Sequence, residues 1–264
     1  MMQRAYVLWI IAIILGVIIM FYQRVTGPTY PKLVKQEIEQ QIIKCKLPRS
    51  WTSGERAVVE IPAQKLQGKF LISYRRFKSY DVWATDTMQY KDGKYFFQLP
   101  TLPPAGKIVY SLAYYDGNVK KNIAESVVLR YKGKVPTWIL IFHVLMMIQS
   151  VFWGIRAGLE AIFRRKNLKK FSYFATLFLF IGGLILGPIV QYYAFGAFWT
   201  GWPLGHDLTD NKTAVSLIFW FIALWKLRKD PQHWKVVLLA SAVQVLMYFI
   251  PHSVLGSEID FTKE

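Results

Sequence analysis

Long apolar stretches without charge recur along the chain and alternate with basic loops. The first covers residues 5–22, eighteen residues with no charged side chain. That is about the length of helix that crosses the roughly 30 Å hydrocarbon core of a bilayer. Four further stretches follow after residue 135. The pattern predicts five transmembrane helices, at 5–22, 136–163, 171–198, 209–227 and 234–250.

Two of these spans carry local signals. Residues 21–24 end the first span with an aromatic and basic flank instead of a cleavage site, which predicts an uncleaved anchor. Pro188 lies inside the third span and should kink it, because proline lacks the N–H group that an α-helix needs. Gly182, Gly183 and Gly187 in the same span allow a neighbouring helix to approach closely.

The charges of the short loops predict the orientation. Basic residues gather between the second and third spans and between the fourth and fifth, whereas Lys212 beside the loop at 198–212 is balanced by Asp207 and Asp210. Short basic loops stay in the cytoplasm. We therefore expect the amino terminus inside, the carboxyl terminus outside, and residues 25–134 on the outer (periplasmic) side of a bacterial inner membrane. The basic residues are Arg164, Arg165, Lys166, Lys169 and Lys170 in one loop and Lys226, Arg228, Lys229 and Lys235 in the other.

Between residues 25 and 134 the pattern changes character. Apolar positions over 33–43 fit a short amphipathic helix, and five strand-like runs separated by turn residues follow. Strands at this spacing predict an Ig-like β-sandwich, in which a tyrosine such as Tyr110 often fixes a corner through its hydroxyl group. The predicted strands are 56–61, 69–76, 95–99, 107–115 and 126–131, with hairpin turns at 91–94 and 116–118.

The chain is thus predicted to be an integral membrane α-helical protein with an inserted β-sandwich. Its parts are an anchor helix (1–24), an outer segment with the short helix and the sandwich (25–134), and a four-helix transmembrane domain (135–264). The last part includes the outer loop at 198–212 and an outer carboxyl-terminal tail.

Composition removes several other classes of protein. The 264 residues are 53% hydrophobic and yet carry a net charge of +17, which excludes a soluble enzyme, a disordered chain and a disulfide scaffold. Cys45 is the only cysteine, so neither an internal disulfide nor a cysteine cage for a metal can form. Residues 24–134 hold twenty Lys and Arg against nine Asp and Glu. Such a surface suits anionic membrane lipids or an acidic protein partner, although a solvated exterior explains it as simply; nucleic acid is not expected outside the membrane.

Three of the four histidines are expected on the outer side. His143 lies in the second span, His206 in the outer loop and His252 after the fifth span. Imidazole is the commonest metal ligand, and Asp207 adds a carboxylate next to His206. These four residues are the candidate metal ligands. The plainer interpretation makes the histidines interface residues or helix–helix contacts.

The outer loop is rich in tryptophan. Residues 199–207 read W-T-G-W-P-L-G-H-D, which an aromatic belt at the membrane interface explains in part. The arrangement over 136–252 is similar to that of haem-handling membrane proteins of cytochrome c maturation, which carry an outer loop W-G-x-x-W-x-W-D-x-x-x-T between spans. The resemblance implies that His143 and His252 ligate haem and that Trp199 and Trp202 form a platform for it.

A second resemblance covers nearly the full length. The segments T-G-P-T-Y-P at 26–31, L-P-P-A-G-K at 102–107, G-H-D-L-T-D-N-K-T at 205–213 and P-H-S-V-L-G-S-E at 251–258 resemble those of an uncharacterised bacterial inner-membrane family. This likeness implies a location in the cell envelope and no particular activity.

Three functions are compatible with these features. The first is an accessory membrane protein whose outer sandwich docks a partner in an envelope complex; the outer segment has no histidine and no paired carboxylates, which favours binding over catalysis. The second is a protein that binds haem or a transition metal. The third is an enzyme for a lipid-linked substrate, for which His206 and Asp207 are the only neighbouring acid–base candidates.

Overall fold

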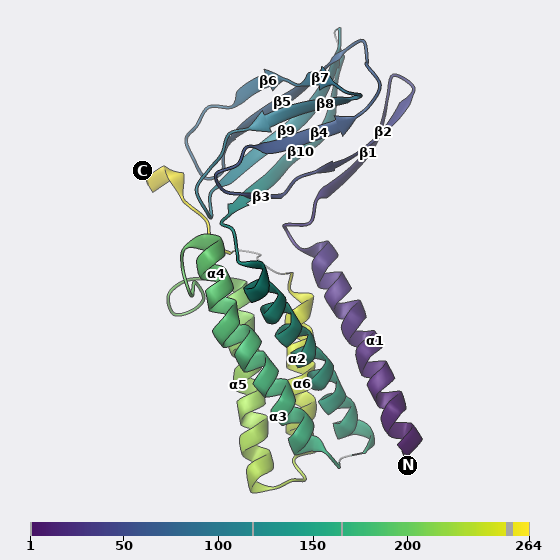
Figure 1. Ribbon diagram of the computed structural model, residues 1–264, viewed down its shortest axis with the longest axis vertical. Helices are drawn as coiled ribbons and strands as arrows, with labels where there is room; N and C mark the ends of the chain where they lie inside the picture. Colours follow the sequence, from purple (N-terminus) through teal and green to yellow (C-terminus); the bar gives the residue numbers. More distant parts are fainter. Residues whose placement is uncertain (1, 118, 165, 252–255, 264) are drawn as a thin grey trace. The chain divides into compact units, whose positions relative to one another are not determined.

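The computed structural model of the chain describes residues 2–117, 119–164, 166–251 and 256–263. The chain divides into two compact units, which Figure 1 shows with their helices and strands labelled. The helical unit comprises Met1–Pro28 and Val135–Gly256, and the β unit comprises Thr29–Lys134 and Ser257–Glu264.

Helices occur at each of the five predicted spans. They are α1 (Met2–Thr26), α2 (Thr137–Phe163), α3 (Leu168–Leu179) with a π-helical turn (Phe180–Leu186) and α4 (Gly187–Phe195), α5 (Leu208–Lys229) and α6 (Trp234–Phe249). Within the described chain, three helical stretches are long and apolar enough to cross a membrane: Ala5–Thr26, Thr137–Phe163 and Leu168–Phe195. These stretches fit a membrane protein. α6 is apolar and shorter, with 16 residues.

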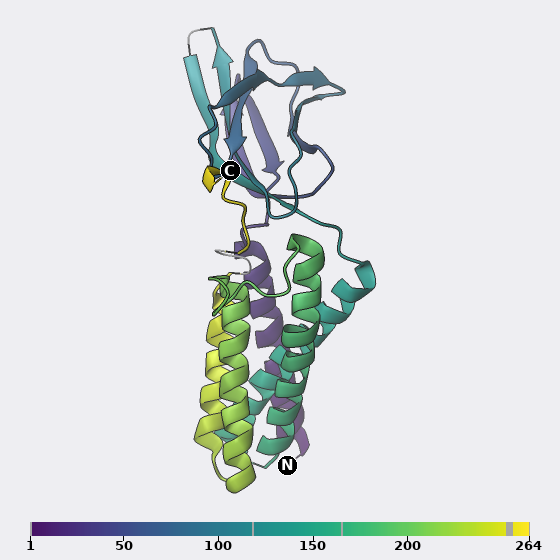
Figure 2. The ribbon, with the colours of Figure 1, turned by 90° about the vertical axis from the view of Figure 1, so that its left-hand side faces the viewer.

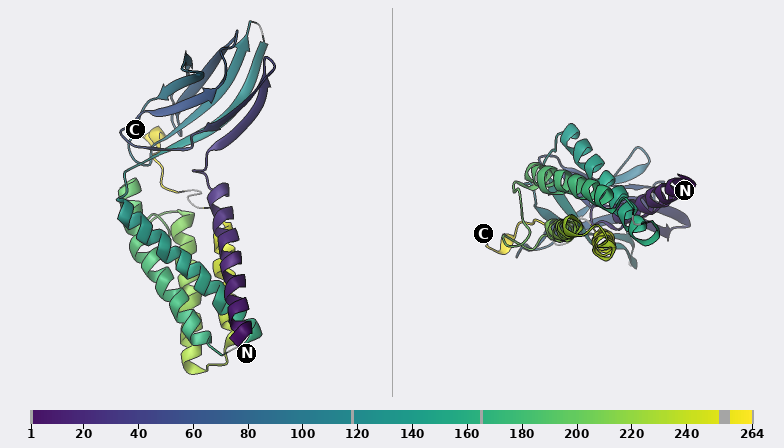
Figure 3. Two further views of the ribbon diagram at one scale, coloured as in Figure 1. Left: turned by 45° about the vertical axis from the view of Figure 1, so that its right-hand side comes forward. Right: turned by 90° about the horizontal axis from the view of Figure 1, so that it is seen from below.

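The helix α2 packs along α1, α3 and α6, and the end-on view of Figure 3 shows the helices of this unit as a bundle. Two glycines of α2 permit close contact with α6. A Cβ atom at Gly154 would lie 2.1 Å from Oε1 of Gln244, and one at Gly158 would lie 2.3 Å from Oγ of Ser241. Small residues spaced in this way let helix backbones approach each other inside membranes.

A π-helical turn lies where a kink is predicted. It comprises Phe180–Leu186 and is separated from Pro188 by Gly187, whose N–H donates to the carbonyl of Gly182, five residues earlier. Because Pro188 offers no N–H and its ring crowds the carbonyl four residues before it, the helix widens at this point. The stretch from α3 to α4 nevertheless continues as one helix (Figure 2).

The described residues of the β unit form three sheets. A five-stranded sheet has the order β3-β10-β9-β5-β6, with β3 parallel to β10; a three-stranded sheet has the order β4-β8-β7; and β1 and β2 form a hairpin. The strands are β1 (Lys32–Ile38), β2 (Gln41–Leu47), β3 (Ser50–Thr52), β4 (Ala57–Pro62), β5 (Lys69–Arg76), β6 (Ala84–Thr87), β7 (Gln89–Lys91), β8 (Lys94–Leu99), β9 (Lys107–Asp116) and β10 (Val119–Lys132).

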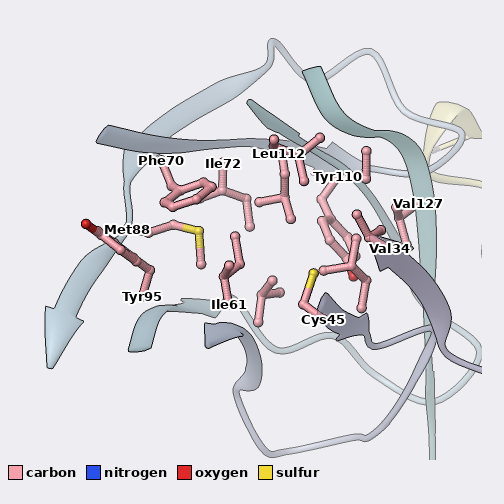
Figure 4. Packing of buried hydrophobic residues seen from close by; sticks show 14 of the residues in the cluster. Val34, Cys45, Ile61, Phe70, Ile72, Met88, Tyr95, Tyr110, Leu112 and Val127 are labelled. Carbon is pink, nitrogen blue, oxygen red and sulfur yellow. The ribbon is translucent and has the colours of Figure 1, made fainter. Parts of the chain in front are cut away.

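One hydrophobic core joins the sheets (Figure 4). Phe70 and Ile72 of β5 meet Ile61 of β4 there, and Cys45 of β2 is buried among them. Tyr110, also fully buried, donates its hydroxyl hydrogen to the carbonyl of Pro48 at 2.9 Å. The tyrosine therefore fixes a connection between strands through its hydroxyl group, at the segment between β2 and β3.

The short helix predicted at 33–43 is wrong, because this segment forms the β1–β2 hairpin. Val34, Ile38 and Ile43 are buried, at positions that both a helical and an alternating pattern accommodate. The conformation of Glu39 and Gln40 explains why the segment forms a hairpin and not a helix. Both have positive φ, at 44° and 64°, as a two-residue hairpin turn requires. The turn lacks the Asn-Gly or Asp-Gly pair that usually marks it.

The five predicted strands correspond to β4, β5, β8, β9 and β10. The predicted turn at 91–94 is present, with Asp92 and Gly93 at positive φ. The predicted turn at 116–118 includes residue 118, which lies outside the described residues. The strand β10 begins earlier than predicted, because bulges between Asn122 and Val127 carry the chain past Ser126 at φ 51°.

Candidate functional site

Two aspartates at the start of α5 hold the loop at 198–212 together. Asp207 caps α5: its Oδ1 accepts from the N–H of Thr209 at 2.8 Å, and its Oδ2 accepts from the hydroxyl group of Thr200 at 3.2 Å. Asp210 accepts from the N–H groups of Thr200 and Gly201 at 2.7 and 3.0 Å. Both carboxylates are buried. The polar string of the loop therefore has a structural role, which is the ordinary role of a helix cap.

The two tryptophans lie in the same loop but differ in exposure. The indole N–H of Trp199 donates to the carbonyl of Trp202 at 3.1 Å. The side chain of Trp202 is exposed, while the backbone N–H of Trp202 donates to Oδ1 of Asn211 at 2.6 Å. The indole of Trp199 is thus bound to the loop backbone, whereas the indole of Trp202 is presented to the surroundings.

His143 contacts the π-helical turn. Its Nδ1 lies 2.8 Å from the carbonyl oxygen of Gly182. A carbonyl only accepts, so Nδ1 carries the hydrogen and Nε2 is left with a lone pair. Metal-binding histidines are held in the same way, through the ring nitrogen that does not touch the metal.

The predicted metal and haem residues are not shown to converge. No three His, Cys, Asp or Glu side chains in the described parts of the chain are grouped so that they could hold a metal ion. His143 and Asp207 make separate hydrogen bonds, and His206 is exposed in the loop. His252 lies outside the described residues, so its predicted place beside the other histidines stays a prediction.

Buried polar contacts inside the bundle were missed at the sequence level. The amide of Gln244 in α6 donates to Ser150 of α2 at 2.7 Å and accepts from the indole of Trp220 in α5 at 2.9 Å. All three side chains are buried. The sequence does contain a signal for these contacts, namely uncharged polar residues within apolar helices. Such residues form hydrogen bonds that hold membrane helices together.

Arg156 and Glu160, four residues apart in α2, form an ion pair at 2.9 Å, and both side chains are buried. The second oxygen of Glu160 accepts from the N–H groups of Lys166 and Asn167 at 3.1 and 3.2 Å. The guanidinium of Arg156 also lies over the ring of Phe171, 4.4 Å from its centroid. The pair thus joins α2 to the start of α3.

The hairpin β1–β2 presents a basic face, which we call the hairpin face. Leu33, Lys35 and Glu37 lie directly opposite Lys46, Lys44 and Ile42 in the antiparallel register, and all six side chains are exposed. Lys35 and Lys44 are therefore like charges directly opposite each other on the two strands, which destabilises a strand pair. No ion pair to either lysine is present in the described part of the chain.

The carboxyl-terminal tail, grouped with the helices in the sequence analysis, belongs to the β unit. Glu258 forms ion pairs with Lys107 and Lys78, and the N–H of Ile259 donates to the carbonyl of Ala105 at 3.3 Å. Phe261 is buried under the guanidinium of Arg76. Burial alone would raise the pKa of Glu258, but the hydrogen bonds from both lysines outweigh it, and the pKa is lowered.

Comparisons with known proteins leave the family open. None of the protein-family models searched matches the chain. None of the curated proteins searched is similar enough to be a relative. The likenesses to an inner-membrane family and to haem-handling proteins therefore stay predictions, and the function must be argued from the geometry.

Proposed function

We propose that the chain is a five-span accessory protein of the bacterial cytoplasmic membrane whose β unit, an Ig-like sandwich on the outer side, docks an acidic protein partner. Helices at all five predicted spans support the count. Basic residues in the loops at 164–170 and 226–235 support the orientation. Sheets around one core support the sandwich.

The hairpin face is the observation that carries the docking function. Lys35 and Lys44 repel each other across the two strands, and exposed Leu33 and Ile42 lie on the same face. A partner that places carboxylates between the lysines relieves the repulsion and covers the aliphatic side chains. Charge complementarity of this kind sets the choice of partner and the rate of association more than the affinity.

Photo-crosslinking in living cells tests this proposal. A photo-reactive amino acid replaces Ile42 on the hairpin face or, as a matched control, Asp92 in the exposed turn between β7 and β8. We expect a discrete protein adduct from position 42 that the charge reversals Lys35→Glu and Lys44→Glu abolish, and none from position 92. Absence of an adduct at position 42, or an adduct that survives both reversals, would overturn the proposal.

Binding of haem or a transition metal is the second candidate, favoured by one observation. His143 donates through Nδ1 to a carbonyl and keeps Nε2 free to accept, as a ligand histidine does. An absorption spectrum and metal analysis of the purified full-length protein test it. A Soret band or stoichiometric metal that His143→Ala removes would support the candidate. Colourless, metal-free protein that takes up no added haemin would refute it.

A further inference from the structure

The loop between β5 and β6, residues 77–83, exposes large apolar side chains. Tyr80 is 86% exposed, Val82 is 90% exposed and Trp83 is 43% exposed. Contiguous apolar exposure of this kind marks a surface that binds something, whereas single exposed apolar residues do not.

Hydrogen bonds within the loop hold these side chains outward. Nε and the second guanidinium nitrogen of Arg76 donate to the two carboxylate oxygens of Asp81 at 2.8 and 2.9 Å. The hydroxyl group of Ser79 donates to the carbonyl of Arg76 and accepts from the N–H of Asp81. Asp81 is thus directed back onto the strand, and its neighbours Tyr80 and Val82 point away from it. The shape of the loop is built before any ligand arrives, which lowers the entropic cost of binding.

The register of the sheet shows where the loop emerges. Arg76, the last residue of β5, is level with Ile108 of β9, which is level with Leu129 of β10. The loop therefore leaves the sheet at the end from which β10 continues into α2. β10 ends at Lys132 and α2 begins at Thr137, a connection that spans at most about 17 Å when extended.

The charges and residue types of the loop match a lipid interface. Tyrosine and tryptophan are enriched where headgroups meet acyl chains. Arg75 precedes the loop, and its guanidinium lies 5.1 Å from the ring centroid of Trp83. Lys78 lies within the loop, where it is paired with Glu258. Basic side chains next to exposed aromatic rings are attracted to anionic headgroups.

We propose that loop 77–83 binds the surface of an anionic bilayer and places Tyr80 and Val82 at the boundary between headgroups and acyl chains. This contact is independent of the hairpin face, because it involves another sheet and another ligand. The β unit would thereby be held to the lipid directly, in addition to its covalent connections.

An environment-sensitive fluorophore on Val82→Cys tests the contact in the full-length protein, reconstituted in nanodiscs of phosphatidylcholine and phosphatidylglycerol. Val119→Cys is the matched control: Val119 is also exposed and pairs with Asp116 at the opposite end of the same sheet. Burial raises the pKa of the native Cys45 thiol to about 11, so it does not compete for the label at neutral pH.

We expect the label at position 82 to emit at shorter wavelength, with several-fold higher intensity, and to be quenched by spin-labelled lipid. The label at position 119 should behave as in water. Removing phosphatidylglycerol should weaken the signal at position 82. Equal, water-like emission at both positions would overturn the proposal. A change at position 82 that requires added envelope proteins and not lipid would also overturn it, in favour of a protein ligand.

Discussion

At the scale of single residues, several buried charged groups of this protein have a partner. Asp210 receives two backbone N–H groups, Glu160 receives two more, and Arg156 lies between Glu160 and an aromatic ring. Charged groups in an apolar bundle are costly when unpaired and therefore act as strong restraints when paired. The loop at 198–212 is ordered for this reason, independently of any ligand.

Substitution of Asp210 should consequently loosen the loop at 198–212. In Asp210→Ala the N–H groups of Thr200 and Gly201 lose their acceptor, and each unsatisfied buried group costs about 1–3 kcal/mol. We expect a clear fall in the thermal unfolding midpoint of the protein in detergent. Asp210→Asn, which keeps one oxygen acceptor, should lose less. If Asp210→Ala unfolds at the wild-type temperature, the carboxylate does not hold the loop.

At the scale of elements, glycines of α2 determine how closely α6 packs. In Gly158→Ala the new methyl group would lie 2.3 Å from Oγ of Ser241. Overpacking of this kind typically costs about 1–3 kcal/mol. We expect Gly158→Ala to lower the unfolding midpoint and the double variant Gly158→Ala/Ser241→Ala to recover part of the loss. Additive effects of the two substitutions would show that the residues do not touch.

The tail should leave the β unit in acid. The pKa of Glu258 is lowered from the ordinary value of 4.5, so its stabilising contribution is complete above that value and is lost as the pH falls through the lowered pKa. A spin label on Lys263→Cys should become mobile in that acid range. Glu258→Gln should make the label mobile at neutral pH as well. A label that is equally immobile in both proteins would show that Phe261 alone retains the tail.

The strands and helices were predictable to the extent that their signal is local. The apolar stretches predicted the helices, and the pair Asp92-Gly93 predicted a hairpin turn. Residues 33–43 were mistaken for a helix because Val34, Ile38 and Ile43 fit both periods and Glu39-Gln40 is an uncommon turn. The G-x-x-x-G spacing of Gly154 and Gly158 was visible in the sequence. Contacts that need tertiary packing, such as Lys78 with Glu258, left no local signal.

At the scale of the whole molecule, the division into a helical unit and a β unit matches the two proposed roles, anchoring for the helices and binding for the strands. The polar contacts described inside the helical unit serve its own packing, while both proposed binding surfaces, the hairpin face and loop 77–83, lie on the β unit. The single cysteine is buried and has a raised pKa, which makes the chain suitable for site-directed labelling without further substitution.

The five-span topology gives a sharp expectation for such labelling. Leu204 precedes α5 and Lys229 ends it, and both are exposed. If α5 crosses the membrane as proposed, Leu204→Cys reacts with an impermeant maleimide added to intact cells, and Lys229→Cys reacts only after the membrane is opened. Detergent-solubilised protein, in which both sites react, serves as the control for accessibility. Reaction of both cysteines in intact cells would contradict the topology.

The π-helical turn at Phe180–Leu186 determines how the helix formed by α3 and α4 can change length. Removing one residue from an ordinary helix rotates everything beyond it by about 100°. A π-helical turn already contains one residue more than an α-helical turn needs, so a deletion there would leave Gln191 facing Thr200, its partner at 2.5 Å. The helix formed by α3 and α4 thus contains a position that accommodates one extra residue, and His143, hydrogen-bonded to Gly182 within that turn, is the contact that removing this residue would disturb first.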